Sequence, residues 1–296
     1  MMTPALRPDG QLADGIRYER GGVFDLAREC FESVALRADE NPAAAAEALW
    51  RLGNLHRLHS SWAEALDAAR QSVALARTFN LEDIEADALN IEGAVWWHRG
   101  DFAQARDLFN KMLTLARTHA TRGKALQNLG GLAAEERNFD EGERLFAESR
   151  DVYRLAGDSR GEAVSLLNIG HLQRERGDVA EARVTLEAAA TAARQTGDME
   201  MYAAALLNLG IALSELGLRE EAEDLITTAY GHVTIANIPV ERVRCLRQLA
   251  RLLVQRNDGT AARACLIHAR EVATSSGVLS ELSLVEDQLA AIPAAE

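Results

Sequence analysis

The chain has 296 residues, of which 26% are charged and 5% are aromatic, and it contains only five prolines. Its formal net charge of −13 at pH 7 argues against general attraction to nucleic acid or to an anionic membrane. No run approaches the ~18 apolar residues of a membrane-spanning helix, and the opening residues 1–8 lack the apolar core of a signal peptide.

A small residue recurs along the chain at intervals of 37 to 40 residues, at Gly15, Gly53, Gly93, Gly130, Gly170, Gly210 and Ala250. Twelve residues after each of these anchors stands a second one: Ala27, Ala65, Ala105, Gly142, Ala182, Ala222 and Ala262. A fixed period of ~40 residues is typical of an array of helical repeats. The pattern predicts seven helix–turn–helix repeats over residues 8–42, 43–80, 81–120, 121–158, 159–198, 199–237 and 238–277, followed by a capping helix over 278–292.

Two positions in each repeat are typical of chain reversals. Seven residues after the anchor lie Gly22, Ser60, Gly100, Arg137, Gly177, Gly217 and Asn257, and 27 residues after it lie Asn80, Gly157, Gly197, Asn237 and Gly277. Glycine and asparagine accept positive φ, which ends a helix, and an aspartate after the turn, such as Asp178, is expected to cap the next helix. In the first repeat, Pro8 and Gly10 are expected to limit the first helix to one or two turns.

The small anchors predict where two helices cross closely, because a larger side chain would push the helix axes apart. The bulky partner is expected sixteen residues further on, at Phe31, Phe109, Phe146, Leu186, Ile226 and Leu266. Ala69 is the exception in this series, and we expect Trp62 to fill the space there.

The sequence carries no motif for catalysis or for a cofactor. Its seven histidines form neither an HExxH pair nor a zinc-binding spacing with the cysteines, and there is no GxSxG, phosphate loop or GxGxxG. Cys30, Cys245 and Cys265 are odd in number and scattered, as expected for reduced core residues of a cytoplasmic protein. We therefore expect a protein that is not an enzyme and needs no metal or cofactor.

Stretches such as Asn128-Leu129-Gly130, Phe139-Asp140-Glu141-Gly142 and Leu209-Gly210 resemble the tetratricopeptide repeat family. The longer repeat is similar to the variety found in bacterial peptide-sensing regulators, the effector domain of the maltose regulator, kinesin light chain and spindle-orientation adaptors. The resemblance implies an all-α, right-handed superhelical solenoid over residues 1–296 as one domain. It also implies that the first helix of each repeat lines a concave groove.

In such solenoids the residues two before and one, four and five after the anchor point into the groove. Two before the anchor, this chain has Asn128, Asn168, Asn208 and Gln248. An amide side chain both donates and accepts, so a row of amides can pair with an extended peptide backbone. The resemblance implies this role for the three asparagines and, by extension, for Gln248. The alternative is that these asparagines only bond a neighbouring helix.

The other inward positions set the charge of the predicted groove. Glu135, Glu175 and Glu215 stand five after the anchor, with His171 and Arg174 on the same helix as Glu175, so a basic or mixed-charge peptide is favoured. In the amino-terminal half the inward residues turn aromatic and basic: Arg51, Asn54, Arg57, Trp97 and His98. Tryptophan and arginine are typical anchors of protein interfaces.

The sequence thus predicts a protein–protein interaction module that binds a peptide or protein segment, as an adaptor or as the sensing domain of a bacterial regulator. Neither nucleic acid nor membrane is an expected partner. Two alternatives stay open. One is a self-assembling scaffold, since the amino-terminal repeat lacks a cap and is free to dock on a second copy. The other is a domain that binds a small-molecule effector.

Overall fold

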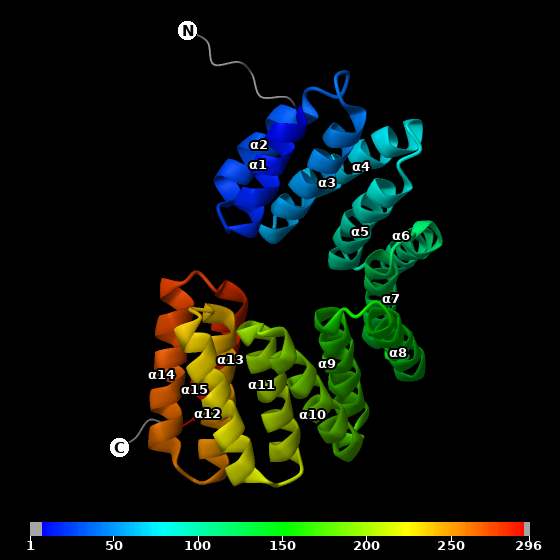
Figure 1. The fold of residues 1–296 in the computed structure, drawn as a ribbon. Coiled ribbons are helices and arrows are strands. Elements are labelled where there is room, and N and C mark those ends of the chain that lie inside the picture. The colour runs from blue at the N-terminus through cyan, green and yellow to red at the C-terminus, as the bar shows by residue number, and fades with distance from the viewer. Residues whose placement is uncertain (1–7, 293–296) are drawn as a thin grey trace. The chain divides into compact units, whose positions relative to one another are not determined.

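The computed structural model describes residues 8–292, apart from the side chain of Leu279, and these residues form fifteen α-helices and no strand (Figure 1). Residues 1–7, which belong to the opening stretch that is not expected to form a signal peptide, lie outside this range. The helices are α1 (Pro8–Arg20), α2 (Phe24–Ala35), α3 (Pro42–Leu58), α4 (Trp62–Thr78), α5 (Glu82–His98), α6 (Phe102–Leu115), α7 (His119–Glu135), α8 (Phe139–Leu155), α9 (Ser159–Arg176), α10 (Val179–Thr196), α11 (Met199–Glu215), α12 (Arg219–Ile235), α13 (Pro239–Gln255), α14 (Gly259–Ser275) and α15 (Leu279–Ala291). The fold is the predicted all-α array of tetratricopeptide-like helix pairs with a carboxy-terminal capping helix.

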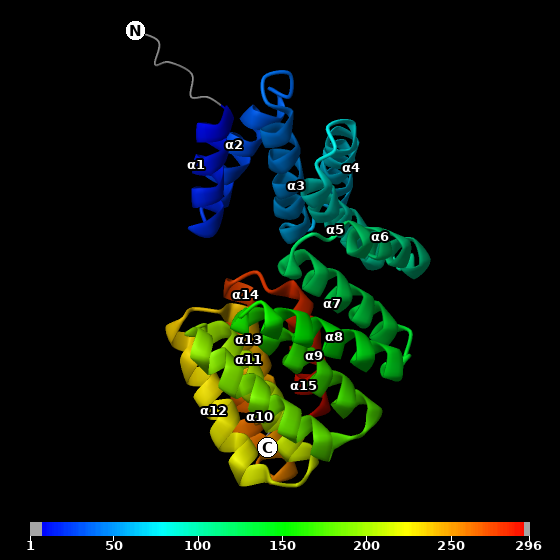
Figure 2. The same ribbon diagram turned by 45° about the vertical axis from the view of Figure 1, so that its right-hand side comes forward.

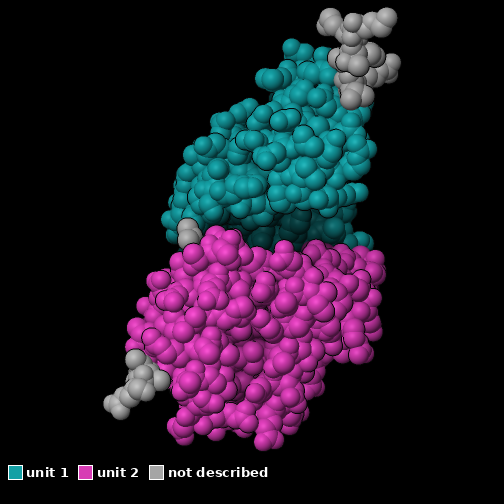
Figure 3. Space-filling view, turned by 90° about the vertical axis from the view of Figure 1, so that its left-hand side faces the viewer, with its two compact units in different colours: residues 1–136 teal, residues 137–296 magenta. Residues whose placement is uncertain are grey.

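The chain divides into two compact units, one ending at Glu136 and the other beginning at Arg137 (Figure 3). We call them unit 1 and unit 2. The division falls between α7 and α8, inside the predicted repeat 121–158. Within each unit, helices adjacent in sequence pack on one another (Figures 1 and 2). A single continuous solenoid over residues 1–296 stays a prediction.

The two helices of a repeat have different neighbours. The first helices are α1, α3, α5 and α7 in unit 1 and α9, α11, α13 and α15 in unit 2, and each packs directly on the next first helix of its unit. Within each unit, as far as residues 8–292 describe it, no second helix packs on the next second helix in this way. The first helices therefore form one continuous surface in each unit, which we call the first-helix face.

The predicted turn residues all adopt positive φ. Gly22, Gly100, Gly177 and Gly217 do so between the helices of a repeat, and Gly157, Gly197 and Gly277 do so between repeats. Even the non-glycine members, Ser60, Asn80, Arg137, Asn237 and Asn257, have φ between 55° and 61°. The period therefore predicted a backbone conformation that Ser60 and Arg137 would not suggest by residue type alone.

Two local expectations were wrong. Asp178 does not cap α10, because its carboxylate accepts from the Arg176 guanidinium instead. Asp158, Asp198 and Asp258 do cap their helices, each accepting from the backbone N–H three residues ahead. The first helix is also longer than expected, at 13 residues, because a proline at the first helical position lacks an N–H that would be unpaired there anyway.

The close crossings are as predicted. A Cβ placed on Gly93, Gly170 or Gly210 would lie 2.5–2.6 Å from the side chain of Phe109, Leu186 or Ile226, respectively. As expected, Trp62 packs on the cluster that contains Ala69, but the atoms nearest to a Cβ on Gly53 are the Ala65 carbonyl oxygen at 3.2 Å and Ile91 at 3.4 Å. With alanine at position 69, the backbone of α4 itself approaches α3. Gly130 and Phe146 belong to different units, so their pairing stays a prediction.

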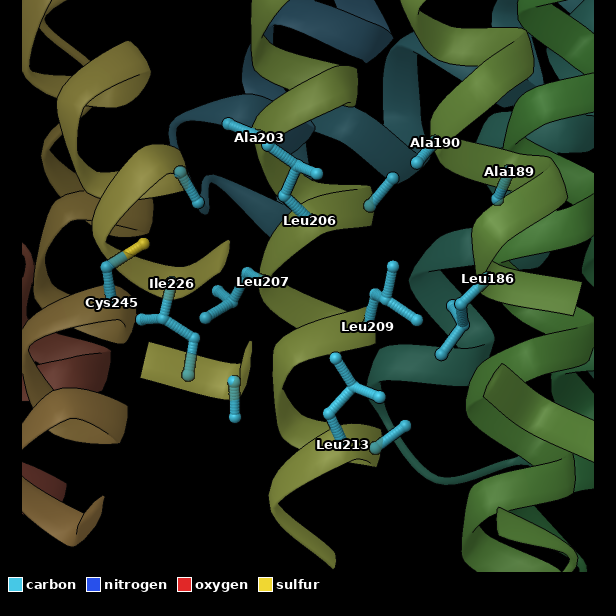
Figure 4. Close-up of a cluster of buried hydrophobic side chains, with 14 of the residues drawn as sticks. Leu186, Ala189, Ala190, Ala203, Leu206, Leu207, Leu209, Leu213, Ile226 and Cys245 are labelled. Atoms are coloured by element: carbon cyan, nitrogen blue, oxygen red, sulfur yellow. The ribbon is translucent and has the colours of Figure 1, made fainter. Parts of the chain in front are cut away.

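Leucine and alanine side chains from neighbouring repeats build the core of unit 2. Figure 4 shows α11 between its neighbours, with Leu209 on the side that faces Leu186 of α10 and Leu207 on the side that faces Ile226 of α12 and Cys245 of α13. Burial raises the pKa of the Cys245 thiol to about 12. The prediction of core cysteines holds for Cys245 only, since Cys30 and Cys265 are half-buried.

We predict opposite effects for alanine at two helical glycines. Gly170→Ala places its methyl group against Leu186 and is expected to destabilise the fold by about 1–3 kcal/mol, because the buried leucine must shift. Gly231→Ala, on α12, meets no atom within 4 Å and is expected to stabilise it by about 0.5–1 kcal/mol. Thermal melts monitored by circular dichroism measure both effects. A rise in melting temperature for both variants would contradict the close-crossing interpretation.

Candidate functional site

A mainly polar stripe runs along the exposed side of α3, α9, α11 and α13. On α9 it includes Asn168, His171, Arg174 and Glu175, while Ile169, Gly170 and Leu172 between them are buried. This follows from helical periodicity, because residues two before and one, four and five after the anchor share one side of the helix. The exception among these positions is Ile91, which is 2% exposed and packs in the core of unit 1.

The members of the amide row differ in their surroundings. Asn168 on α9 is half-buried, and its side-chain amide hydrogen-bonds to no group within residues 8–292. Asn208 on α11 donates to the Ala204 carbonyl at 2.8 Å, and the Gln248 carbonyl on α13 accepts from Arg251 at 3.1 Å. These three amides of unit 2 therefore retain donor or acceptor capacity for a ligand, and Asn168 retains all of it.

Asn128 lies in unit 1 and is held by a neighbouring helix. Its amide donates to the side-chain oxygen of Asn90 on α5, over 2.6 Å. Asn90 stands three residues before its own anchor, on the same stripe, and sequence reasoning missed it. The alternative of helix-to-helix bonding therefore describes Asn128 well.

The glutamates are not equivalent either. Glu215 on α11 accepts from the guanidinium of Arg174 on α9 at 2.9 Å, so this pair carries no net charge. Glu175 lies 3.8 Å from His171, and Glu135 is exposed in unit 1 with no ion-pair partner among the described residues. The stripe is therefore of mixed charge rather than uniformly acidic.

The pKa of His171 depends on charged groups from three helices of the first-helix face of unit 2. Burial lowers the pKa of His171, and the cations Arg174 and Arg244 lower it further, while Glu175 and Glu215 oppose them. Arg244 lies on α13, so α9, α11 and α13 share one electrostatic environment. His171 is consequently favoured in its neutral form at pH 7, where it presents both a donor and an acceptor.

Sequence reasoning missed the arginines of α13. Arg244 and Arg247 stand six and three residues before Ala250, and both bond Glu281 of the capping helix α15, at 3.0 and 2.5 Å. Glu281 is a buried carboxylate, only 6% exposed. Their spacing from Ala250 puts both arginines on the same side of the helix as the stripe, so the sequence alone could have predicted their position. The capping helix thus neutralises part of the first-helix face.

In unit 1 the predicted residues Arg51, Asn54 and Arg57 lie together along α3. Arg51 is bound by Glu19 at 2.7 Å and by Glu47 at 2.9 Å, and its guanidinium stacks on Trp50. Arg57 donates to the Asn54 side-chain oxygen at 2.9 Å. Burial lowers the pKa of Arg57, and no carboxylate among residues 8–292 pairs with it.

Two predicted residues of unit 1 are engaged in packing. The Trp97 ring fills the space beside Gly131 of α7, where a Cβ would lie 2.4 Å from it, and meets Phe109 edge-on. His98 is stacked on Trp62 with ring centroids 3.7 Å apart. Both side chains therefore have partners within unit 1. Asp87 and Lys124, 3.7 Å apart on α5 and α7, were missed, and burial raises the pKa of Asp87.

Two sequence profiles described as tetratricopeptide repeat match the chain, one over residues 121–195 and the other over 12–78 and 167–234. Together they cover more than half of it. The chain belongs to the tetratricopeptide repeat family. Repeats of this family form scaffolds whose extended surfaces bind other proteins. A search of curated proteins found no match.

Similar solved structures have the same fold. The apo form of RapI aligns with a TM-score of 0.70 and 12% identity, covering 91% of this chain and all of that one. A Rap protein complexed with competence and sporulation factor aligns at 0.67 and 16%, covering 96% and 87%. A signal-transduction ATPase with a tetratricopeptide repeat sensor, from Pyrococcus horikoshii, aligns at 0.71 and 12%, covering 93% and 42%. These identities establish the fold alone.

No helix within residues 8–292 is long and apolar enough to cross a membrane.

We predict that the asparagines differ in their contribution to stability. Asn128→Ala removes the hydrogen bond to Asn90 and is expected to lower the free energy of unfolding by about 1 kcal/mol relative to Asn168→Ala. Asn168→Ala breaks no internal bond, and alanine favours the helix. Chemical denaturation of both variants measures the difference. Equal stabilities would show that the bond to Asn90 contributes nothing.

A second prediction concerns the capping helix. Glu281→Gln leaves Arg244 and Arg247 without their shared buried carboxylate and is expected to cost about 3 kcal/mol. Glu271→Gln, at a carboxylate whose side chain is 69% exposed, is the matched control and should stay within about 0.5 kcal/mol of the parent. If the two substitutions cost the same in urea denaturation, the cap does not depend on this ion pair.

Proposed function

We propose that the chain is an interaction module that binds an extended segment of a partner protein on the first-helix face, as an adaptor or as the sensing domain of a regulator. The observation that carries the proposal is the amide row of unit 2. Asn168, Asn208 and Gln248 occupy the same position relative to the anchor on three adjacent first helices, and the side chain of Asn168 has no hydrogen bond within residues 8–292. An unbonded, half-buried amide on an exposed stripe is suited to pair with the backbone of a ligand.

The residues around the amide row suit a peptide. Leu167, Ile211 and Val254 lie on the same stripe and are partly exposed, so they offer apolar contacts beside the polar row. An extended peptide places its side chains alternately on two sides, so it can use apolar contacts and backbone pairing at once. This combination favours a peptide over a small polar effector.

The charges favour a segment of mixed charge. Arg174 and Glu215 neutralise each other, and Arg244 and Arg247 are bound to Glu281. Glu175 and Arg251 remain exposed at the two sides of the face, without a carboxylate–guanidinium partner in residues 8–292. A ligand with both a cationic and an anionic group therefore complements the face better than a purely basic one.

One similar structure supports this proposal. It is a complex of a Rap protein with competence and sporulation factor, and its fold covers nearly all of the present chain. The shared fold supports a bound factor of this kind as the ligand class of this chain.

The test is a selection of displayed random peptides of about 12 residues on the intact chain, followed by calorimetry with an enriched peptide. Asn168→Ala/Asn208→Ala should bind it at least about fivefold more weakly, because two hydrogen bonds of about 0.5–1.5 kcal/mol each are lost and about 1.4 kcal/mol is one decade. Asn110→Ala, at an exposed asparagine of the second helix α6, is the matched control and should bind like the parent.

Circular dichroism checks that the double variant keeps its fold. A folded double variant that binds the enriched peptide with parental affinity would show that the first-helix face of unit 2 is not the site. A selection that enriches no peptide at all would contradict the proposed ligand class.

A further inference from the structure

A groove lies on unit 1 between the second helices α2 and α4, outside the amide row. It consists of two hollows of about 220 and 470 Å³ that both include His56 in their lining. On one side it extends along α2 from Phe24 to the following residue Leu36, and on the other from Ser61, just before α4, to Gln71. We call it the α2–α4 groove.

The groove is open because α2 is short. It has 12 residues, whereas α4 has 17, and it ends without the positive-φ residue that terminates most second helices. The chain then leaves through Leu36, which stands at the groove rim and is 89% exposed. Since α2 and α4 do not pack on each other, the side of α3 between them remains accessible.

The floor and rim of the groove are apolar. Leu49 and Leu52 of α3 form the floor, with Ala35 of α2 and the following Leu36 at one side and Ala68 of α4 at the other. At the far end the ring of Phe24 is also partly exposed. Such a surface gains free energy when apolar side chains of a ligand cover it.

Both walls carry negative charge. Glu32 projects from α2, and Glu64 and Asp67 project from α4. Among residues 8–292 none of the three forms an ion pair, although Asp67 accepts from the amide of Gln71 at 2.7 Å. The single arginine in the lining, Arg28, is already paired with Asp25. The walls therefore lack counter-charges that a ligand can supply.

We propose that the α2–α4 groove docks an amphipathic helix of a partner protein whose apolar stripe is flanked by lysine or arginine. The apolar floor receives the stripe, and the carboxylates of the two walls pair with the flanking cations. The length of α2, ~18 Å, matches about three turns of a bound helix. This site is separate from the first-helix face, and the two can be occupied by different segments.

The probe is an amidated peptide of about 14 leucine and lysine residues, with leucine at helical spacing. Its control has the same composition, with the leucines spread around the helix. We expect the amphipathic peptide to bind the intact chain at least tenfold more tightly than its control in fluorescence anisotropy. Because both peptides carry the same charge, the net charge of −13 attracts them equally.

Two matched pairs of variants locate the site. E32Q/E64Q/D67N should weaken binding of the amphipathic peptide at least tenfold, whereas E220Q/E221Q/D224N, the same charge change on exposed positions of α12, should weaken it less than threefold. Leu36→Lys should weaken binding, and Leu155→Lys, at an 81% exposed leucine of α8, should leave it unchanged. All four changes lie at exposed positions and leave folding intact.

Four results would overturn the proposal. The two peptides could bind equally well, or the α12 variant could lose as much affinity as the groove variant, which would indicate general electrostatic attraction. Alternatively, sedimentation could show self-association that Leu36→Lys abolishes, which would assign the groove to a second copy of the chain. Loss of binding in Asn168→Ala/Asn208→Ala but not in the groove variants would place the probe on the first-helix face.

Discussion

The close crossing of two helices at a residue without a large side chain is the contact on which this structure depends. At Gly93, Gly170 and Gly210 the first helix offers only hydrogen where a Cβ would collide with Phe109, Leu186 or Ile226 of the second. This contact sets the rotation of each helix about its own axis. Once that rotation is set, every other residue of the first helix has a defined direction, because each successive residue turns by a constant angle.

The polar stripe of the first helices is a consequence of this fixed rotation. Residues at fixed offsets from the anchor repeat at ~40-residue intervals, and the first helices of a unit pack side by side, so the stripes merge into one face. Within each unit the second helices of residues 8–292 do not pack on one another, and between α2 and α4 the side of α3 stays accessible. The first-helix face and the α2–α4 groove therefore both follow from an array in which only the first helices pack on one another.

The site is less uniform than its spacing suggests. Asn128 and Asn168 have the same phase, yet one is bonded to Asn90 and the other to no protein group. Glu175 and Glu215 also share a phase, yet Arg174 neutralises only Glu215. In each case the difference is made by a residue of the neighbouring repeat. The residues free to meet a ligand are those whose neighbours leave them unpaired.

The sequence by itself determined the helix pairs, the turns and the side of each helix that is exposed, because these depend on interactions within one repeat. Even Ser60 and Arg137, which stand at the repeat position of the turn, adopt positive φ. Only the tertiary structure decided which polar side chains are already paired, since Asn90 and Asn128, Arg174 and Glu215, and Arg247 and Glu281 come from different repeats. It also decided the α2–α4 groove, whose walls belong to successive repeats. A long polar side chain can bond any of several neighbours within its reach, and the spacing of residues in the sequence does not show which of them it bonds. A glycine at a close crossing has no side chain, so its position alone predicts its contact.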